Sequence, residues 1–171
     1  MALIKDRKPA HDSWQLLEAG ADGTVGIPEA GDVLVPLACW LASREALIAR
    51  GSRRGVWLAG DDEPADLAPH FDEIDLIAVR FASFTDGRGY SIGRLLRQRH
   101  GWTGELRAIG DIQRDQLFYL TRCGFNAFAL REGEDVGTAL AAFSDFSEAY
   151  QTAFDRPVPL FRRREAAGGV H

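Results

Sequence analysis

From about Asp32 onward, short apolar runs alternate with segments whose apolar residues recur at helical spacing. The apolar runs predict buried strands at 33–37, 55–59, 74–81, 105–109 and 126–130. The intervening segments predict helices at 43–50, 64–70, 92–99, 114–122 and 135–150. Glycines at positions 51, 101 and 124 mark the ends of three of these helices. Repeated strand–helix alternation predicts a mainly parallel sheet joined by right-handed crossovers.

The predicted fold class is therefore α/β, with about five mainly parallel strands in a single core domain at 31–151. An open doubly wound sheet fits this length, and a partial barrel is the alternative, because a closed eight-unit barrel needs about 250 residues. Residues 1–30 scatter apolar positions among glycines and predict an N-terminal arm or hairpin. Residues 152–171 combine prolines with a basic cluster and predict a flexible tail.

Composition narrows the class of protein further. A chain of 171 residues that is 46% hydrophobic buries about two-thirds of its unfolded surface, which one compact domain satisfies. The net charge of −5 argues against nucleic acid or an anionic membrane as a partner. No apolar run approaches the roughly 18 residues of a membrane-spanning helix, and the charged N-terminus does not resemble a secretory signal. We expect a soluble, cytoplasmic protein.

Cysteine and histidine are too sparse for a metal centre. Cys39 and Cys123 lie far apart, so the sequence gives no support to a disulfide framework, a structural zinc site or a four-cysteine iron–sulfur cluster. The four histidines are scattered and show no ligand spacing. We expect no metal site, and we expect both cysteines to be structural thiols.

The loop Phe84–Ser91 follows the predicted strand at 74–81 and leads into a helix, which makes it the first candidate site. Gly87 and Gly89 allow positive φ and would let backbone N–H groups approach a ligand closely. Arg88 adds a cationic fork, and hydroxyl groups come from three neighbours, so phosphate, sulfate, sulfite or a carboxylate would fit. These neighbours are Thr85, Tyr90 and Ser91. The alternative is a tight turn in which Asp86 itself caps the helix.

A second polar turn follows the predicted strand at 105–109. It contributes Asp111, Arg114, Asp115 and Gln116, and the carboxyl ends of parallel strands should bring it beside the first loop. Asp111 is a weak candidate for an acid or base, although helix capping explains it equally well. Arg131, after the fifth predicted strand, could join this group, and an Asp–Arg ion-pair network is favoured over an acid–base pair.

Nucleotide-binding signatures fail on spacing. Gly87-x-Gly89 is followed by Gly93, one residue too late for the dinucleotide fingerprint, and no Gly-Lys-Ser/Thr loop is present. We expect Gly93 to permit close helix packing instead. No cofactor motif is evident, and the sequence leaves a bound flavin or nicotinamide open.

Four motifs give the chain its resemblance to a known family. They are Phe-Thr-Asp-Gly-Arg-Gly-Tyr-Ser at 84–91, Gly-Glu-Leu-Arg-Ala-x-Gly-Asp at 104–111, Arg-Asp-Gln at 114–116 and Arg-Cys-Gly-Phe at 122–125. Over about residues 30–151 the chain resembles the bacterial family called domain of unknown function 934. It departs from the family at Arg80, Ala82 and Asn126, where we expect altered residues at the rim of a pocket.

Proteins of that family carry the label of oxidoreductases involved in sulfite reduction. The resemblance therefore implies an accessory protein of assimilatory sulfite reduction, which docks on sulfite reductase or its electron donor, or binds a small oxyanion. Sulfite reduction transfers six electrons and ordinarily needs siroheme with an iron–sulfur cluster, so a chain with two cysteines is not the reductase itself. The alternative is a small enzyme or oxidoreductase that acts on an anionic metabolite at Asp86, Arg88, Asp111 and Arg114. The sequence leaves catalysis and oligomeric state open.

Overall fold

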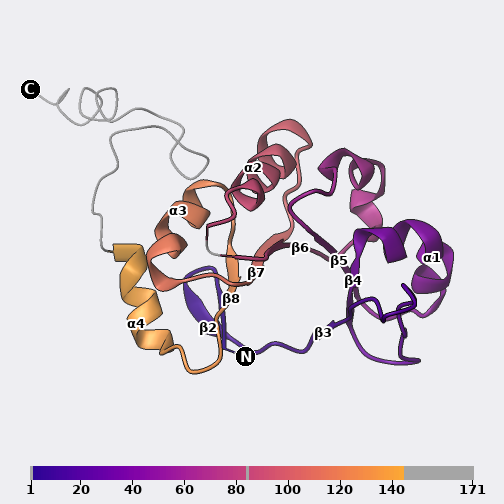
Figure 1. Ribbon diagram of the computed structural model, residues 1–171, viewed down its shortest axis with the longest axis horizontal. Helices are drawn as coiled ribbons and strands as arrows, with labels where there is room; N and C mark the ends of the chain where they lie inside the picture. The colour runs from indigo at the N-terminus through magenta and orange to yellow at the C-terminus, as the bar shows by residue number, and fades with distance from the viewer. Residues whose placement is uncertain (1, 84, 145–171) are drawn as a thin grey trace, which may run out of the picture.

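Within the part of the chain that the structure describes, eight strands form one mixed sheet in the order β2-β1-β8-β7-β6-β5-β4-β3 (Figure 1). The structure is a computed structural model that describes residues 2–83 and 85–144. Strands β3 to β8 pair in parallel, whereas β1 is antiparallel to both β2 and β8. The strands are β1 (Leu3–Lys5), β2 (Lys8–Ala10), β3 (Gln15–Leu16), β4 (Val33–Pro36), β5 (Arg54–Leu58), β6 (Leu76–Phe81), β7 (Glu105–Gly110) and β8 (Ala127–Ala129).

The five strands predicted from apolar runs correspond to β4 through β8. The predicted count of five is too low, because three further strands lie in the N-terminal arm. Two of them, β1 and β2, form the expected hairpin, whose two-residue turn places Asp6 and Arg7 at positive φ. The third, β3, has only two residues, both exposed, and this leaves no apolar signal from which to predict it.

The helical elements follow the predicted ones closely. They are α1 (Leu37–Ala49), η1 (Pro64–Asp66), η2 (Ala68–Glu73), α2 (Arg88–Arg94), η3 (Leu95–Arg99), η4 (Arg114–Gln116), α3 (Leu117–Arg122), α4 (Val136–Ala141) and η5 (Ala142–Ser144). Helix α1 begins six residues before the predicted start at Ser43, and Ser43 marks a kink within it. The helix predicted at 135–150 is present as far as Ser144; its remainder and the basic tail lie outside the described residues.

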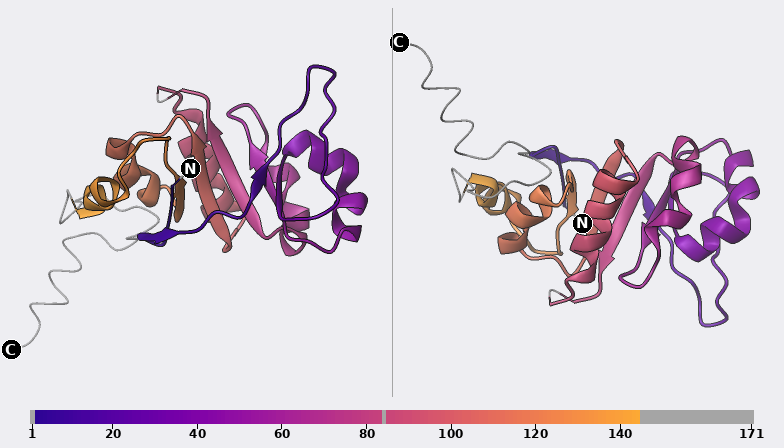
Figure 2. Two further views of the ribbon diagram at one scale, coloured as in Figure 1. Left: turned by 90° about the horizontal axis from the view of Figure 1, so that it is seen from below. Right: turned by 90° about the horizontal axis from the view of Figure 1, so that it is seen from above.

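All of the helical elements pack against the same face of the sheet. Strands β3 to β8 follow one another in chain order without a reversal, so each right-handed crossover places its helix on that face. The prediction of a doubly wound sheet is therefore wrong, since such a sheet carries helices on both faces. The sheet instead curls into a half-barrel, the alternative that the sequence left open, with α2 in front of the strands in the view from above (Figure 2, right).

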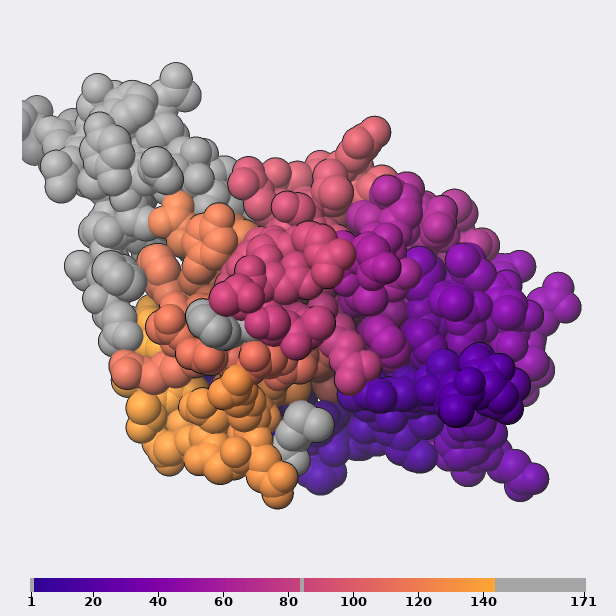
Figure 3. Space-filling view, viewed as in Figure 1, coloured from indigo at the N-terminus to yellow at the C-terminus, as the bar shows by residue number. Residues whose placement is uncertain are grey.

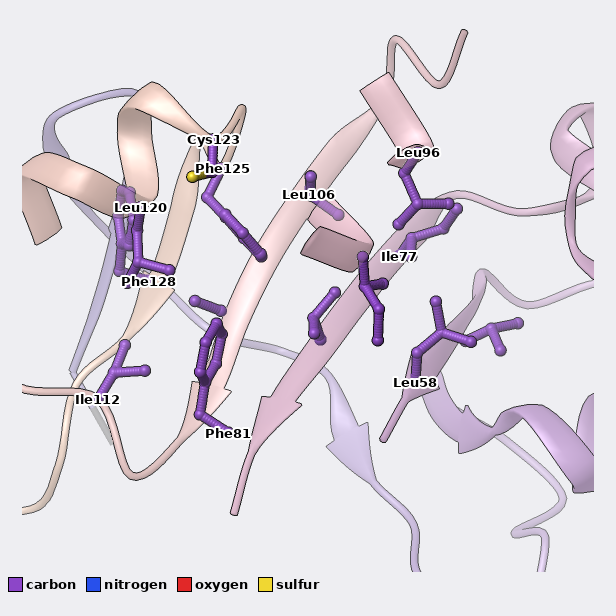
Figure 4. Packing of buried hydrophobic residues seen from close by; sticks show 14 of the residues in the cluster. Leu58, Ile77, Phe81, Leu96, Leu106, Ile112, Leu120, Cys123, Phe125 and Phe128 are labelled. Atoms are coloured by element: carbon purple, nitrogen blue, oxygen red, sulfur yellow. The ribbon is translucent and has the colours of Figure 1, made fainter. Parts of the chain in front are cut away.

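The main core fills the space between the sheet and these helices (Figure 4). Phe81 on β6 faces Phe125, with ring centroids 6.0 Å apart. A Cβ on Gly93 would lie 2.4 Å from the Phe125 ring, so this glycine permits close helix packing, as predicted. Cys123 is buried in the same cluster, as predicted for a structural thiol, whereas Cys39 is partly buried at its border.

Buried Arg97 connects three segments at the amino ends of the strands. Its guanidinium donates to the carbonyl oxygens of Trp102, Gly104 and Gly124 at 2.7, 2.8 and 2.9 Å, and to Oδ1 of Asn126 at 3.2 Å. Burial lowers the pKa of this guanidinium. Asn126 precedes β8, so this departure from the family pattern belongs to the amino edge of the sheet and not to a pocket rim at the carboxyl edge.

The opposite, open face of the sheet is covered by residues 11–18, which we call the N-terminal strap. In Figure 1 this indigo segment spans the sheet on the side away from α2 and α3, and in the view from below it passes in front of the strands (Figure 2, left). In the space-filling view, the indigo N-terminal segment lies against the purple atoms around β4 and α1 (Figure 3). Strap residue Leu17 donates its N–H to the Leu34 carbonyl and accepts a bond from the Trp57 indole, both at 2.9 Å.

Candidate functional site

The two predicted loops lie at the same edge of the sheet. One follows β6 and the other follows β7, and these strands are parallel neighbours, as the sequence implied. The Asp111 N–H donates to the Phe81 carbonyl at 2.8 Å, and the Gln116 amide donates to the Tyr90 hydroxyl at 2.9 Å. The loops are thus bonded into one structural unit. Phe84, at the start of the first loop, lies outside the described residues.

In the first loop, the Asp86 carboxylate is hydrogen-bonded to Arg88. Its carboxylate accepts from the Arg88 backbone N–H at 3.1 Å and from the guanidinium at 2.9 and 2.8 Å. The guanidinium and backbone bonds of Arg88 lower the pKa of Asp86. Asp86 therefore binds the first N–H of α2 and neutralises the arginine as well, although Gly87 and not Asp86 occupies the N-cap position.

The two loop glycines do not use the positive φ that glycine allows. Gly87 has a φ of −76°, and Gly89 is not among the residues with positive φ. Gly89 is required for packing instead, because a Cβ there would lie 2.6 Å from the Phe81 ring. Gly89 is thus explained by contact with the core, whereas a Cβ at Gly87 would meet no atom within 4 Å.

The second turn also pairs an aspartate with an arginine. Asp111 forms an ion pair with Arg131, which follows β8, so Arg131 joins the group as expected. Arg114 donates from Nε to the Thr138 carbonyl at 3.1 Å and so contacts α4. Gln116 accepts the Gln113 N–H at 2.8 Å and closes the first turn of η4. The sequence favoured Asp–Arg ion pairs over an acid–base pair. Asp86 does pair with Arg88, and Asp111 pairs with Arg131.

An exposed tyrosine completes this edge. The Tyr119 side chain is 52% exposed, and its ring lies 5.0 Å from that of Tyr90, which in turn packs edge-on against Phe81 at 5.2 Å. Burial raises the pKa of Tyr90. The sequence analysis missed Tyr119, although its position between the core residues Leu117 and Leu120 places it on the outer side of α3.

We call the exposed residues of this region the edge surface. They are Thr85, Arg88, Ser91, Arg114, Asp115, Tyr119 and Arg131. The loop residues Asp86, Tyr90, Asp111 and Gln116 support them from positions that are partly buried.

A cavity of about 430 Å³ lies on the open face of the sheet, beneath the N-terminal strap. Its apolar lining is Trp14, Leu16, Leu34, Ile109 and Ala129. Its charged lining consists of two strap carboxylates, Asp12 and Glu18, and two sheet arginines, Arg80 and Arg107. Arg80, one of the three family departures, lines this cavity.

The charged groups of the cavity form two sets. Arg107 lies between Asp12 at 2.9 Å and Glu105 at 2.7 Å, and Lys5 pairs with Glu105 at 2.7 Å. Arg80 pairs separately with Glu18, also at 2.7 Å. The sequence analysis named Arg80 only as a departure from the family and gave Arg107 no role. Strand alternation identifies both, because each lies between residues whose side chains face the main core.

Within residues 2–83 and 85–144, no group of three or more histidine, cysteine or acidic side chains is arranged to hold a metal ion. Over the same residues, no helix is both long and apolar enough to cross a membrane.

Comparison with known proteins identifies a family. The model of a bacterial protein family of unknown function, DUF934, matches residues 55–161, more than half of the chain. The match begins and ends later than the expected 30–151, and it contains all four motifs. No curated protein and no solved structure gives a significant match. The chain therefore belongs to the DUF934 family of bacterial proteins.

Proposed function

We propose that this chain is an accessory protein of assimilatory sulfite reduction, which docks through the edge surface on the reductase or on its electron donor. The pathway comes from the label that proteins of this family carry. The location comes from the family motifs, because residues 85–91, the end of the motif at 104–111 and residues 114–116 lie together beyond the carboxyl ends of β6 and β7.

The observation that carries the proposal is the exposed Tyr119 ring, which packs on Tyr90 of the loop that holds the Asp86–Arg88 pair. Exposed tyrosines and arginines are enriched in protein interfaces, where an aromatic anchor is surrounded by polar groups. Tyr90 supports the ring from below, and Gln116 fixes Tyr90 by a hydrogen bond. Tyr119 is thus held in place before a partner arrives, which reduces the entropy lost on binding.

The charges of the edge favour a protein partner over a free oxyanion. Arg88 already binds the Asp86 carboxylate, and Arg131 binds that of Asp111. A small anion at either arginine would compete with a carboxylate held nearby in the same chain. Mixed, paired charges instead suit a partner that presents complementary charges over a wide area.

The same contacts bear on the alternative of a small enzyme. In that alternative, Arg88 and Arg114 hold an anionic metabolite while Asp111 acts as acid or base. Arg88 is bound within its own loop, whereas Arg114 contacts the Thr138 carbonyl on α4. Since the two arginines engage different elements, docking is the better supported proposal.

Affinity purification of the tagged full chain from sulfate-grown cells tests this proposal. We expect the wild-type chain to enrich sulfite reductase or its electron donor. Tyr119→Ala should reduce that enrichment about tenfold or more, because loss of an interface anchor commonly costs about 2 kcal/mol.

Leu41→Ala is the matched control, since Leu41 is a comparably exposed apolar residue, 49% accessible, on α1. This variant should enrich the partner as well as the wild type does. Equal enrichment by Tyr119→Ala, or no enrichment of any sulfur-assimilation protein by the wild type, would refute docking at this edge.

A further inference from the structure

We propose that the open-face cavity binds a small organic anion, whose acid group replaces Glu18 on Arg80 and whose apolar part contacts Trp14 and Leu16. This site is separate from the edge surface, and the inference does not depend on docking there. A volume of about 430 Å³ lies within the range of small-molecule sites, and such sites combine an apolar lining with a few polar groups.

The two arginines of the cavity are held very differently. The Arg107 side chain is 3% exposed and donates to both Asp12 and Glu105, so removal of either carboxylate would leave a buried charge poorly compensated. The Arg80 side chain is 35% exposed, and its partner Glu18 is 54% exposed. Exposed ion pairs contribute little to stability, so Glu18 is the carboxylate that a ligand can displace.

Arg80 remains in place when Glu18 leaves. Its guanidinium carbon lies 5.1 Å from the centre of the Trp57 ring, and Trp57 is bonded through its indole N–H to the strap. Glu18 lies beyond the two strap residues that pair with β4, namely Gln15 and Leu16. Glu18 can therefore turn outward while these pairs and the roof of the cavity stay intact.

The balance of charges in the cavity determines whether the ligand is an anion or a cation. Lys5 and Arg107 are matched by Glu105 and Asp12, so these four groups are neutral together. Once Glu18 turns away, Arg80 leaves one positive charge uncompensated at the cavity. The site then favours a ligand with one negative charge. A cation is disfavoured, because Asp12 and Glu105 are each already paired with an arginine or a lysine.

The apolar lining selects an organic anion over an inorganic one. Leu34 and Ile109 belong to the small buried cluster of the open face, and Trp14 packs against that cluster from the strap. Leu34 and Ile109 are only 2% and 5% exposed, so the more accessible apolar lining is that of Trp14 and Leu16, and an inorganic oxyanion would leave it uncovered. A carboxylate or sulfonate with an apolar body would cover it and gain hydrophobic free energy that an inorganic anion lacks.

Isothermal titration calorimetry of the full chain tests the inference with benzoate, benzenesulfonate and inorganic sulfate at millimolar concentrations. We expect the two organic anions to bind more tightly than sulfate. Glu18→Gln should bind them about twofold to fivefold more tightly, because it removes the competing carboxylate. Arg80→Gln should weaken them at least about tenfold. Glu45→Gln, at an exposed position on α1, should bind as the wild type does.

Because Glu18 is an exposed residue, Glu18→Gln should fold normally and decides the question even if Arg80→Gln does not fold. Unchanged or weaker binding by Glu18→Gln would overturn the inference, as would the absence of binding of either organic anion by this variant. Sulfate binding as tight as that of benzenesulfonate would overturn the organic class of the ligand. Docking at the edge surface would survive any of these results.

Discussion

At the residue scale, the guanidinium of Arg97 links the loops at the amino edge of the sheet by hydrogen bonds. Arg97 donates to three carbonyl oxygens that come from the loop after η3 and from the turn before β8. Carbonyl groups that lose a buried donor retain their desolvation cost without a bond in return. Arg97 is therefore a structural residue, although its charge would suggest a binding role from sequence alone.

Arg97→Met should lower the free energy of unfolding by about 2–4 kcal/mol, because several buried hydrogen bonds are lost while the aliphatic volume is largely kept. Urea denaturation followed by tryptophan fluorescence measures this change. Arg99→Met, two residues away at an exposed position, should stay within about 0.5 kcal/mol of the wild type. Equal effects of the two substitutions would contradict the role assigned to Arg97.

Individual residues also show how far sequence reasoning reaches. The pairing of Asp86 with Arg88 could be predicted, since both lie in one short polar loop. The role of Gly89 could not, because the same small residue suits either a ligand or an aromatic ring, and only the fold brings Phe81 against it. Tyr119 was missed because a single exposed side chain leaves no mark in a pattern of hydrophobicity, and the pairing of Arg80 with Glu18 was missed because the two residues lie far apart in the sequence.

At the scale of elements, Asp32 connects the first three parallel strands. It precedes β4, accepts from the backbone N–H and guanidinium of Arg53 just before β5, and accepts from the Ser13 hydroxyl in the strap. The hydrogen bonds from Arg53 lower the pKa of Asp32 below its model-compound value of 3.8. This carboxylate therefore stabilises the fold in its charged form.

A lowered pKa gives stability that is present above the unfolded value and is lost as the pH falls through the folded value. Asp32→Asn should therefore be less stable than the wild type at pH 6, and the difference should shrink below about pH 3.8. Urea denaturation of both proteins at the two ends of this range measures it. A difference that stays constant, or grows, on acidification would show that the charge of Asp32 is not what stabilises the strap and β5.

Elements differ in how well the sequence predicts them. Strands β4 to β8 are apolar on at least one face and were found from their apolar runs. β3 is held by backbone bonds to β4, and its two side chains are exposed, so hydrophobic periodicity carries no information about it. The cavity was missed for the same reason, because the strap that covers it is recognised only once β3 is placed.

At the scale of the molecule, strand order separates the predicted doubly wound sheet from the observed half-barrel. The sequence of local elements is the same in both folds, and the order of strands depends on contacts between distant segments. Sequential order places every helix on one face and leaves the other to the strap. The molecule therefore has two separate candidate regions, the edge surface at the carboxyl ends of the strands and the cavity on the open face.

The central claim is that this chain supports the reduction of sulfite, and a deletion strain tests it most directly. Growth is measured with sulfate, sulfite, sulfide or cysteine as sole sulfur source, with the wild-type gene restored as control. The account predicts normal growth on sulfide and cysteine, impaired growth on sulfite and sulfate, and restoration by the wild-type chain. Equal growth of the deletion strain on sulfite and on sulfide would contradict the account.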